Sequence, residues 1–161
     1  MSYDVNLDSI FAFVGEDMPA ASTRGVTGIV KPIPGKVIEM LDGEDRNVSR
    51  AGMKKFAYSI RGSDVWVPPF IGQWPGDEVT VDLPILFVEP IGTPQQRPAV
   101  PGTLFYIDAA KSAVVDAGAA AFRCYYPRAV CLVGTWTIDN DEDGAVSTWT
   151  YDVKEKRVGG T

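Results

Sequence analysis

Three aspartates and a glycine near the C-terminus have the spacing that opens a calcium-binding EF-hand loop. Asp139, Asp141 and Asp143 occupy alternate positions, and Gly144 stands where the loop needs its sharp turn. The loop also needs a bidentate glutamate at its twelfth position, where this chain has Thr150. The acidic stretch therefore lacks the ligand that completes the calcium coordination shell.

The segments on either side of the acidic stretch decide between a calcium site and a turn. Helices flank an EF-hand loop, whereas residues 135–138 and 146–151 alternate β-branched or aromatic residues with others at a period of two. Aspartate, asparagine and glycine also tolerate turn conformations. We therefore predict a β-hairpin with residues 139–144 at its tip, with a calcium site as the alternative.

The remaining residue types give little support for catalysis. The chain has no histidine, which removes His-based catalytic triads and the commonest imidazole metal ligand. It contains no glycine-rich nucleotide-binding motif, and neighbouring carboxylates such as Asp77 and Glu78 lie in a turn-forming stretch. We expect a protein that is not an enzyme, with no catalytic residue, no cofactor and no metal site.

Cys124 and Cys131 are the two cysteines of the chain, too few for a zinc cluster. They could form a disulfide across neighbouring strands or remain as two buried free thiols. If the protein is made in the cytoplasm, where thiols stay reduced, the two free thiols are favoured over the disulfide.

Length and charge indicate a single ordinary globular domain spanning residues 1–161. The chain has 45% hydrophobic and 22% charged residues, and its formal net charge of −6 argues against a general nucleic-acid-binding surface. The N-terminus has no basic region before an apolar run, and no apolar stretch approaches about 18 residues. We expect neither secretion nor a membrane span.

Sixteen glycines and twelve prolines punctuate the chain at short intervals and leave little room for long helices. Between them lie segments that are rich in β-branched and aromatic residues, namely 37–41, 55–62, 78–90, 128–139 and 145–156. The predicted fold is mainly β, an antiparallel β-sandwich or small barrel with one short flanking helix and long loops.

Three segments fall outside this strand pattern. Residues 108–121 are rich in alanine and predict the one helix, with Asp108 as its N-cap; an extended loop is the alternative. Residues 1–36 are expected to form an extended N-terminal arm or loop. Residues 90–102 carry four prolines and predict a long irregular loop, a kind of segment that is usually functional or reaches a partner.

A short basic and aromatic run at residues 54–61 superficially resembles a nucleic-acid surface. In a strand, however, Phe56, Tyr58 and Ile60 would face one side while the charged residues face the other. We interpret the run as a strand with one face in the core.

The four tryptophans fall into two pairs. Trp136 and Trp149 flank the acidic turn, so we expect cross-strand aromatic packing in that hairpin. Trp66 and Trp74 bracket the apolar, proline-fixed residues 67–73. This loop would either contact another subunit or fold over its own core.

Over residues 54–84, a Lys-aromatic strand is followed by a Gly-Ser-Asp turn at residues 62–64, the proline-aromatic loop, Trp-Pro-Gly at residues 74–76 and Val-Thr-Val at residues 79–81. This order of motifs resembles small virion proteins of tailed bacteriophages. The C-terminal pattern, an aromatic strand, an acidic turn and the stretch at residues 147–156, is similar to the final hairpin of phage tail-tube-like proteins.

The resemblance implies a structural protein of the virion that is made in the host cytoplasm. Tail-tube subunits form homo-oligomeric rings that stack around a DNA-conducting lumen and contact other virion proteins, and no membrane is involved. The negative charge suits DNA as a cargo that must not adhere. A capsid decoration protein or a head–tail connector is the alternative within the virion, and a small-ligand-binding β-barrel is the alternative of another class.

The loops and the hairpin tip supply the candidate residues for subunit contacts. They are Trp66, Pro68, Pro69, Phe70, Trp74, Pro94, Arg97, Pro98, Asp141 and Asp143.

Overall fold

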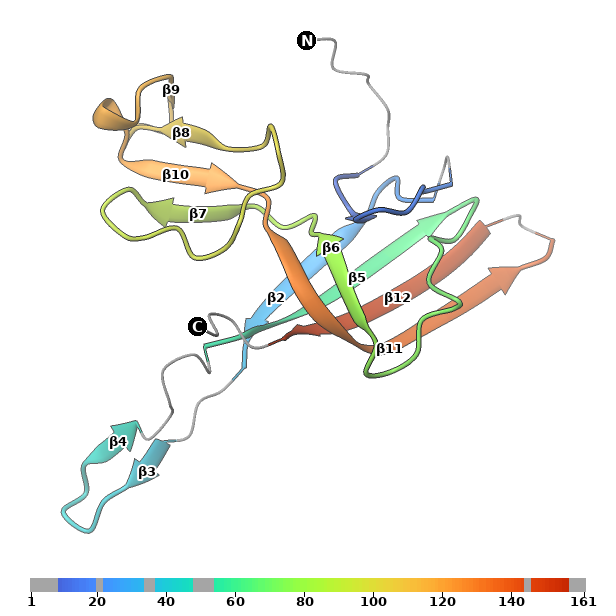
Figure 1. Ribbon diagram of the computed structural model, residues 1–161, viewed down its shortest axis with the longest axis horizontal. Helices are drawn as coiled ribbons and strands as arrows, with labels where there is room; N and C mark the ends of the chain where they lie inside the picture. Colours follow the sequence, from blue (N-terminus) through green and yellow to red (C-terminus); the bar gives the residue numbers. More distant parts are fainter. Residues whose placement is uncertain (1–8, 20–21, 34–36, 48–53, 144–145, 157–161) are drawn as a thin grey trace.

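Antiparallel β-strands form two sheets and one separate hairpin (Figure 1). The structure is a computed structural model that describes residues 9–19, 22–33, 37–47, 54–143 and 146–156. The larger sheet has six strands in the order β1-β6-β11-β12-β5-β2. Their bounds are Ala12–Phe13 (β1), Thr27–Pro32 (β2), Phe56–Asp64 (β5), Glu78–Asp82 (β6), Arg128–Asp141 (β11) and Val146–Glu155 (β12).

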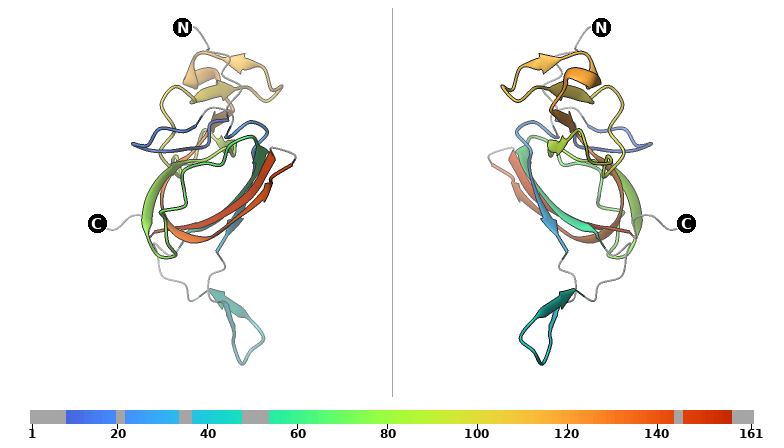
Figure 2. Two further views of the ribbon diagram at one scale, coloured as in Figure 1. Left: turned by 90° about the vertical axis from the view of Figure 1, so that its right-hand side faces the viewer. Right: turned by 90° about the vertical axis from the view of Figure 1, so that its left-hand side faces the viewer.

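The six-stranded sheet curls into a half-barrel (Figure 2). The long strand β11 pairs with β6 through its first five residues and with β12 along most of its length. The register of β11 and β12 shifts between Val133 and Trp136, and a bulge of this kind increases the local twist of a sheet. At Gly134, inside the shift, an added Cβ would lie 2.9 Å from the carbonyl oxygen of Asp152.

The smaller sheet has four strands in the order β7-β10-β8-β9. They are Phe87–Pro90 (β7), Phe105–Ile107 (β8), Ala113–Val114 (β9) and Phe122–Tyr125 (β10). The chain passes from β10 into β11 through residues 126–127, so the two sheets share this connection. A separate hairpin pairs β3 (Val37–Glu39) with β4 (Asp45–Asn47).

The concave face of the half-barrel holds the hydrophobic core. Strand alternation aims every second side chain of β5 and β12 into it. Phe70, from the loop between β5 and β6, fills the centre, where its ring stacks on Tyr151 with centroids 5.2 Å apart. The buried cluster comprises Phe11, Phe13, Tyr58, Ile60, Phe70, Val81, Leu83, Ala129, Cys131, Val133, Trp149, Tyr151 and Val153.

The structure confirms the predicted fold class, mainly β with antiparallel sheets. The strands expected at residues 55–62, 128–139 and 145–156 are present as β5, β11 and β12. The stretch 78–90 is divided into β6 in the larger sheet and β7 in the smaller sheet, with a bend at Pro84 between them. Tyr58 and Ile60 face the core as the alternation predicted.

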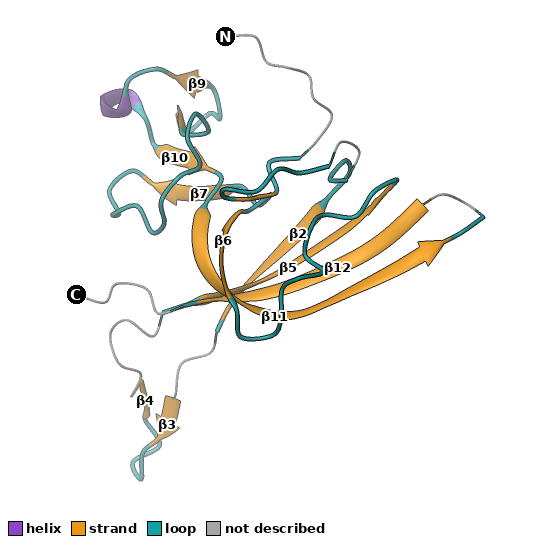
Figure 3. Ribbon diagram, turned by 45° about the vertical axis from the view of Figure 1, so that its right-hand side comes forward, coloured by secondary structure: helices purple, strands orange, loops and turns teal. Residues whose placement is uncertain are grey.

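The helix predicted over residues 108–121 is wrong. The segment contains β9 and a single 3-10 turn, Ala117–Ala119, drawn in purple in Figure 3. The Asp108 side chain accepts hydrogen bonds from the backbone N–H of Ala110 and Ser112, both at 2.9 Å, and so closes a turn rather than capping a helix. Lys111 follows with a φ of 65°, which breaks any helical path.

The described part of residues 1–36 belongs to the body of the protein rather than to an arm. Phe11 and Phe13 are 1% and 2% exposed in the core, and β2 pairs with β5. Arg24 Nη2 donates to Asp64 Oδ1 at 2.8 Å, and this bond lowers the pKa of the Asp64 carboxyl. The expectation of an arm or loop is wrong for β1 and β2, because short strands at sheet edges carry a weak sequence signal.

Gly62 is required where the sheet meets Trp149. The two residues are register partners, and an added Cβ at Gly62 would lie 2.5 Å from Cζ2 of the buried indole. Gly62→Ala should therefore lower the free energy of unfolding by about 1–3 kcal/mol through overpacking. Urea denaturation monitored by tryptophan fluorescence measures this change.

Gly72→Ala is the matched control for Gly62→Ala. Gly72 has no atom within 4 Å of an added Cβ, so the expected change stays within about 0.5 kcal/mol. Equal effects of the two substitutions would contradict the close approach of Trp149.

Candidate functional site: a buried ion pair, an exposed hairpin and a groove

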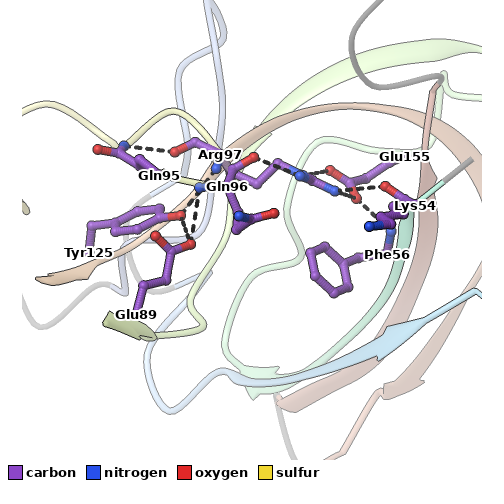
Figure 4. A network of polar contacts seen from close by, with 8 residues as sticks. All are labelled: Lys54, Phe56, Glu89, Gln95, Gln96, Arg97, Tyr125 and Glu155. Carbon is purple, nitrogen blue, oxygen red and sulfur yellow. Dashed lines mark hydrogen bonds and ion pairs between the residues drawn. The ribbon is translucent and has the colours of Figure 1, made fainter. Parts of the chain in front are cut away.

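Arg97 and Glu155 form a buried ion pair where the Pro-rich loop of residues 90–102 meets the six-stranded sheet (Figure 4). The side chains are 7% and 2% exposed. Arg97 Nη2 donates to Glu155 Oε1 at 2.8 Å, and Nε donates to Oε2. The guanidinium also donates to the carbonyl oxygens of Gln96 and Lys54, and it lies 4.8 Å from the centroid of the Phe56 ring. The pair is bidentate and fully enclosed, the geometry in which an ion pair holds two segments together.

The network continues from Arg97 into the smaller sheet. The backbone N–H of Arg97 donates to the Tyr125 hydroxyl at 3.1 Å, and that hydroxyl donates to Glu89 Oε1 at 2.6 Å. Glu89 also accepts from the backbone N–H of Gln96 at 3.1 Å and from Arg123 Nε at 3.3 Å. These contacts join β7, β10 and the Pro-rich loop to the end of β12.

The cluster around the ion pair does not activate a nucleophile. Burial raises the pKa of Tyr58 and Tyr125 above the ordinary range, and the neighbouring carboxylates add to both shifts. Burial also raises the pKa of the Cys131 thiol to about 12, with Glu155 adding to the shift. Reactive cysteines have lowered pKa values instead, so this thiol stays protonated at neutral pH. Cys131 and Cys124 are both free and buried, the alternative that the sequence favoured.

The structure divides the predicted contact residues of the Pro-rich loop. Arg97 is buried in the network and is therefore not available at the surface as a subunit contact. Pro94 and Pro98 are exposed beside it. The sequence did not predict this ion pair, because Arg97 is an isolated arginine in an irregular loop and Glu155 lies 58 positions later.

The apolar loop of residues 65–77 folds over its own core and also exposes aromatic side chains, so it combines the two alternatives that the sequence left open. Pro68 and Phe70 are buried and cover the core, and Pro69 is half-buried. Trp66 and Trp74 are 62% and 71% exposed and remain candidates for subunit contacts.

The acidic tip of the β11–β12 hairpin is a turn. Asp141 ends β11 and its Oδ1 accepts from the backbone N–H of Asp143 at 3.1 Å; both side chains are exposed. Gly144 lies outside the described residues. In the parts of the chain that the structure describes, no group of three or more His, Cys, Asp or Glu residues could hold a metal ion.

The β3–β4 hairpin is a surface that sequence reasoning did not identify. All residues of 37–47 are exposed, so the hairpin packs against neither sheet (Figure 1). Its turn is well formed, because Glu44 N–H donates to Asp42 Oδ1 at 3.1 Å and Gly43 adopts a φ of 82°. Val37 and Leu41 are nevertheless 60% and 111% exposed. The prediction of a strand at residues 37–41 is confirmed by β3. The sequence pattern did not show that this strand lies outside the hydrophobic core.

A groove of about 490 Å³ lies on the outer face of β2, β5 and β12. The registers place Lys31, Ala57 and Lys154 in one row across these strands, and Ile29, Ser59 and Asp152 in the next row. The small residues of β5 therefore form the floor, and the longer side chains of β2 and β12 form the walls. A second groove of about 260 Å³ continues along the same face beside Arg61.

Comparisons of the chain with protein-family models, with curated proteins and with solved structures found no match. Among the described residues, no helix is long and apolar enough to cross a membrane. The assignment of function therefore depends on the geometry described above.

Breaking the buried ion pair should be costly. Arg97→Met leaves the Glu155 carboxylate buried without its cation, so the free energy of unfolding should fall by about 3–5 kcal/mol. Lys156→Met is the control, because the ion pair between Lys156 and Glu78 is about half exposed and should contribute less than about 1 kcal/mol. Chemical denaturation measures both, and similar losses would contradict a structural role of Arg97.

The acidic tip should not depend on calcium. Asp141→Asn retains a side-chain oxygen that can accept from Asp143, so the melting temperature should change by no more than about a degree, with or without millimolar calcium. A rise of several degrees on adding calcium to the native protein would establish the metal site instead.

Proposed function

We propose that this protein is a structural subunit that assembles with copies of itself, most specifically as a tail-tube protein of a tailed-bacteriophage virion. The subunits would form rings that stack around a lumen through which DNA passes. Assembly rather than catalysis is its task, and its partners are other copies and other virion proteins.

The observation that carries this proposal is the exposed β3–β4 hairpin. An isolated two-stranded hairpin is marginally stable in water, and exposed apolar side chains in such an element mark an interaction site. Val37, Ile38, Met40 and Leu41 are all 39% exposed or more. The hairpin therefore has the properties of an element that is completed by another chain.

Three further features support a place in a phage tube. The motif order over residues 54–84 resembles virion proteins, and the net charge of −6 suits a wall to which DNA must not adhere. Trp66 and Trp74 add exposed aromatic area on a different part of the subunit. Rings that also stack need such separate surfaces, because each subunit has several unlike neighbours.

The alternatives differ in what they need from the fold. A capsid decoration protein or a head–tail connector would also use exposed contact surfaces. A ligand-binding barrel needs an open interior, whereas Phe70, Trp149 and Tyr151 fill the concave face and are 0–1% exposed. The filled interior favours assembly over ligand binding.

Negative-stain electron microscopy over a concentration series, with the mass measured in solution, tests the proposed function. Tubes or stacked rings are expected for the native protein. Leu41→Ser in the hairpin should shorten or abolish the tubes. Val115→Ser is the control, because Val115 is an equally exposed apolar residue next to β9 in the smaller sheet, and it should leave the tubes unchanged.

Other outcomes would redirect the assignment. A compact trimer at all concentrations would favour a decoration protein. A stable monomer that binds a hydrophobic dye at one saturable site would favour the ligand-binding barrel.

A further inference from the structure

We infer that the groove on the outer face of β2, β5 and β12 receives the β3–β4 hairpin of a second copy of this chain. This inference rests on the proposed function and names the two surfaces that make its contact. It follows from the charges, the apolar areas and the strand registers of both elements.

The hairpin carries an unbalanced negative charge. Residues 37–47 include four carboxylates and one cation, Arg46. Glu39 and Asp45 are direct register partners, so two like charges oppose each other across the strands, an arrangement that destabilises a β-pair. A pair of cations on another chain would relieve this repulsion.

The groove supplies that pair of cations in a protein whose overall charge is negative. Lys31 and Lys154 flank Ala57 in one row of the sheet, one on each side of the groove floor. Neither lysine forms an ion pair with any residue that the structure describes. Arg61 adds a third cation in the continuing groove, and Asp152 is the carboxylate among the lining residues.

Apolar surface is matched as well as charge. Ile29 is 43% exposed on the wall of the groove, and Ala57 and Ser59 leave its floor open. The hairpin offers Val37 and Leu41, which are exposed in the monomer. Docking would remove both apolar areas from water while the carboxylates meet the lysines.

The edge of the sheet argues for side-chain docking rather than strand addition. β2 is the edge strand next to the groove, and it carries Lys31 and Pro32, residue types that discourage pairing with another strand. The hairpin and the groove that receives it are different surfaces of the same chain. Such a heterologous contact closes into a ring or continues as a filament, depending on the rotation between copies.

Cross-linking between two variants tests the contact directly. Leu41→Cys at the hairpin tip and Ser59→Cys in the groove are purified separately, mixed at millimolar concentration and oxidised, with a size tag on one of them. The native Cys124 and Cys131 are buried and should not react. A mixed disulfide dimer should form at least tenfold faster than with the control Val115→Cys, which is fully exposed elsewhere.

Charge reversal gives a second, independent readout. Lys31→Glu/Lys154→Glu and Glu39→Lys/Asp45→Lys should each lower self-association at least tenfold, because like charges then face each other. Mixing the two variants should restore assemblies that contain both. Lys111→Glu, at an exposed lysine outside the groove, should leave association unchanged.

Each outcome separates the inference from the proposed function. Native-like tubes from Lys31→Glu/Lys154→Glu, or equal cross-linking to the groove and control cysteines, would overturn this contact and leave the tube proposal intact. Loss of double-stranded DNA binding in that variant, with self-association unchanged, would assign the lysines to nucleic acid and also overturn it. The cross-linking reads the contact whether or not tubes form.

Discussion

The concave face of the half-barrel must be filled, and much of the structure follows from that constraint. A six-stranded sheet that curls without closing leaves aromatic side chains of β5 and β12 facing an open trough. Phe70 enters from the loop between β5 and β6, and Phe11 stacks on Trp149 with ring centroids 5.5 Å apart. Segments that look like loop and arm are thereby fixed in place, since removing them would expose the largest apolar side chains of the molecule.

The second constraint is the polar junction between the two sheets. Arg97 and Glu155 are buried together, and Tyr125 and Glu89 extend the network into the smaller sheet. A buried ion pair is weak evidence for added stability, because desolvation offsets much of the attraction. Its partners must nevertheless all be present at once, which fixes the path of the Pro-rich loop against β12.

With the core filled and the junction enclosed, the proposed self-assembly rests on the surfaces that remain. The β3–β4 hairpin presents apolar and acidic residues away from both sheets, and the outer groove presents apolar and basic ones. Trp66 and Trp74 provide a third exposed area. One chain that carries complementary and distinct surfaces is suited to repeated contacts with identical neighbours.

The sequence by itself determined the fold class, the long strands and the turn that follows Asp141, because period-two alternation and turn-forming residues are local signals. It misassigned residues 108–121, where alanine content favours helix but Asp108 bonds its own backbone and Lys111 turns the chain. Only the tertiary structure decided that Arg97 pairs with Glu155 and that Phe70 lies in the hydrophobic core. It also decided that residues 37–47 lie outside the core. It also created the groove, whose lysines are distant in sequence and lie in one row of the sheet only through strand register. Burial and register depend on long-range packing, which no local pattern encodes.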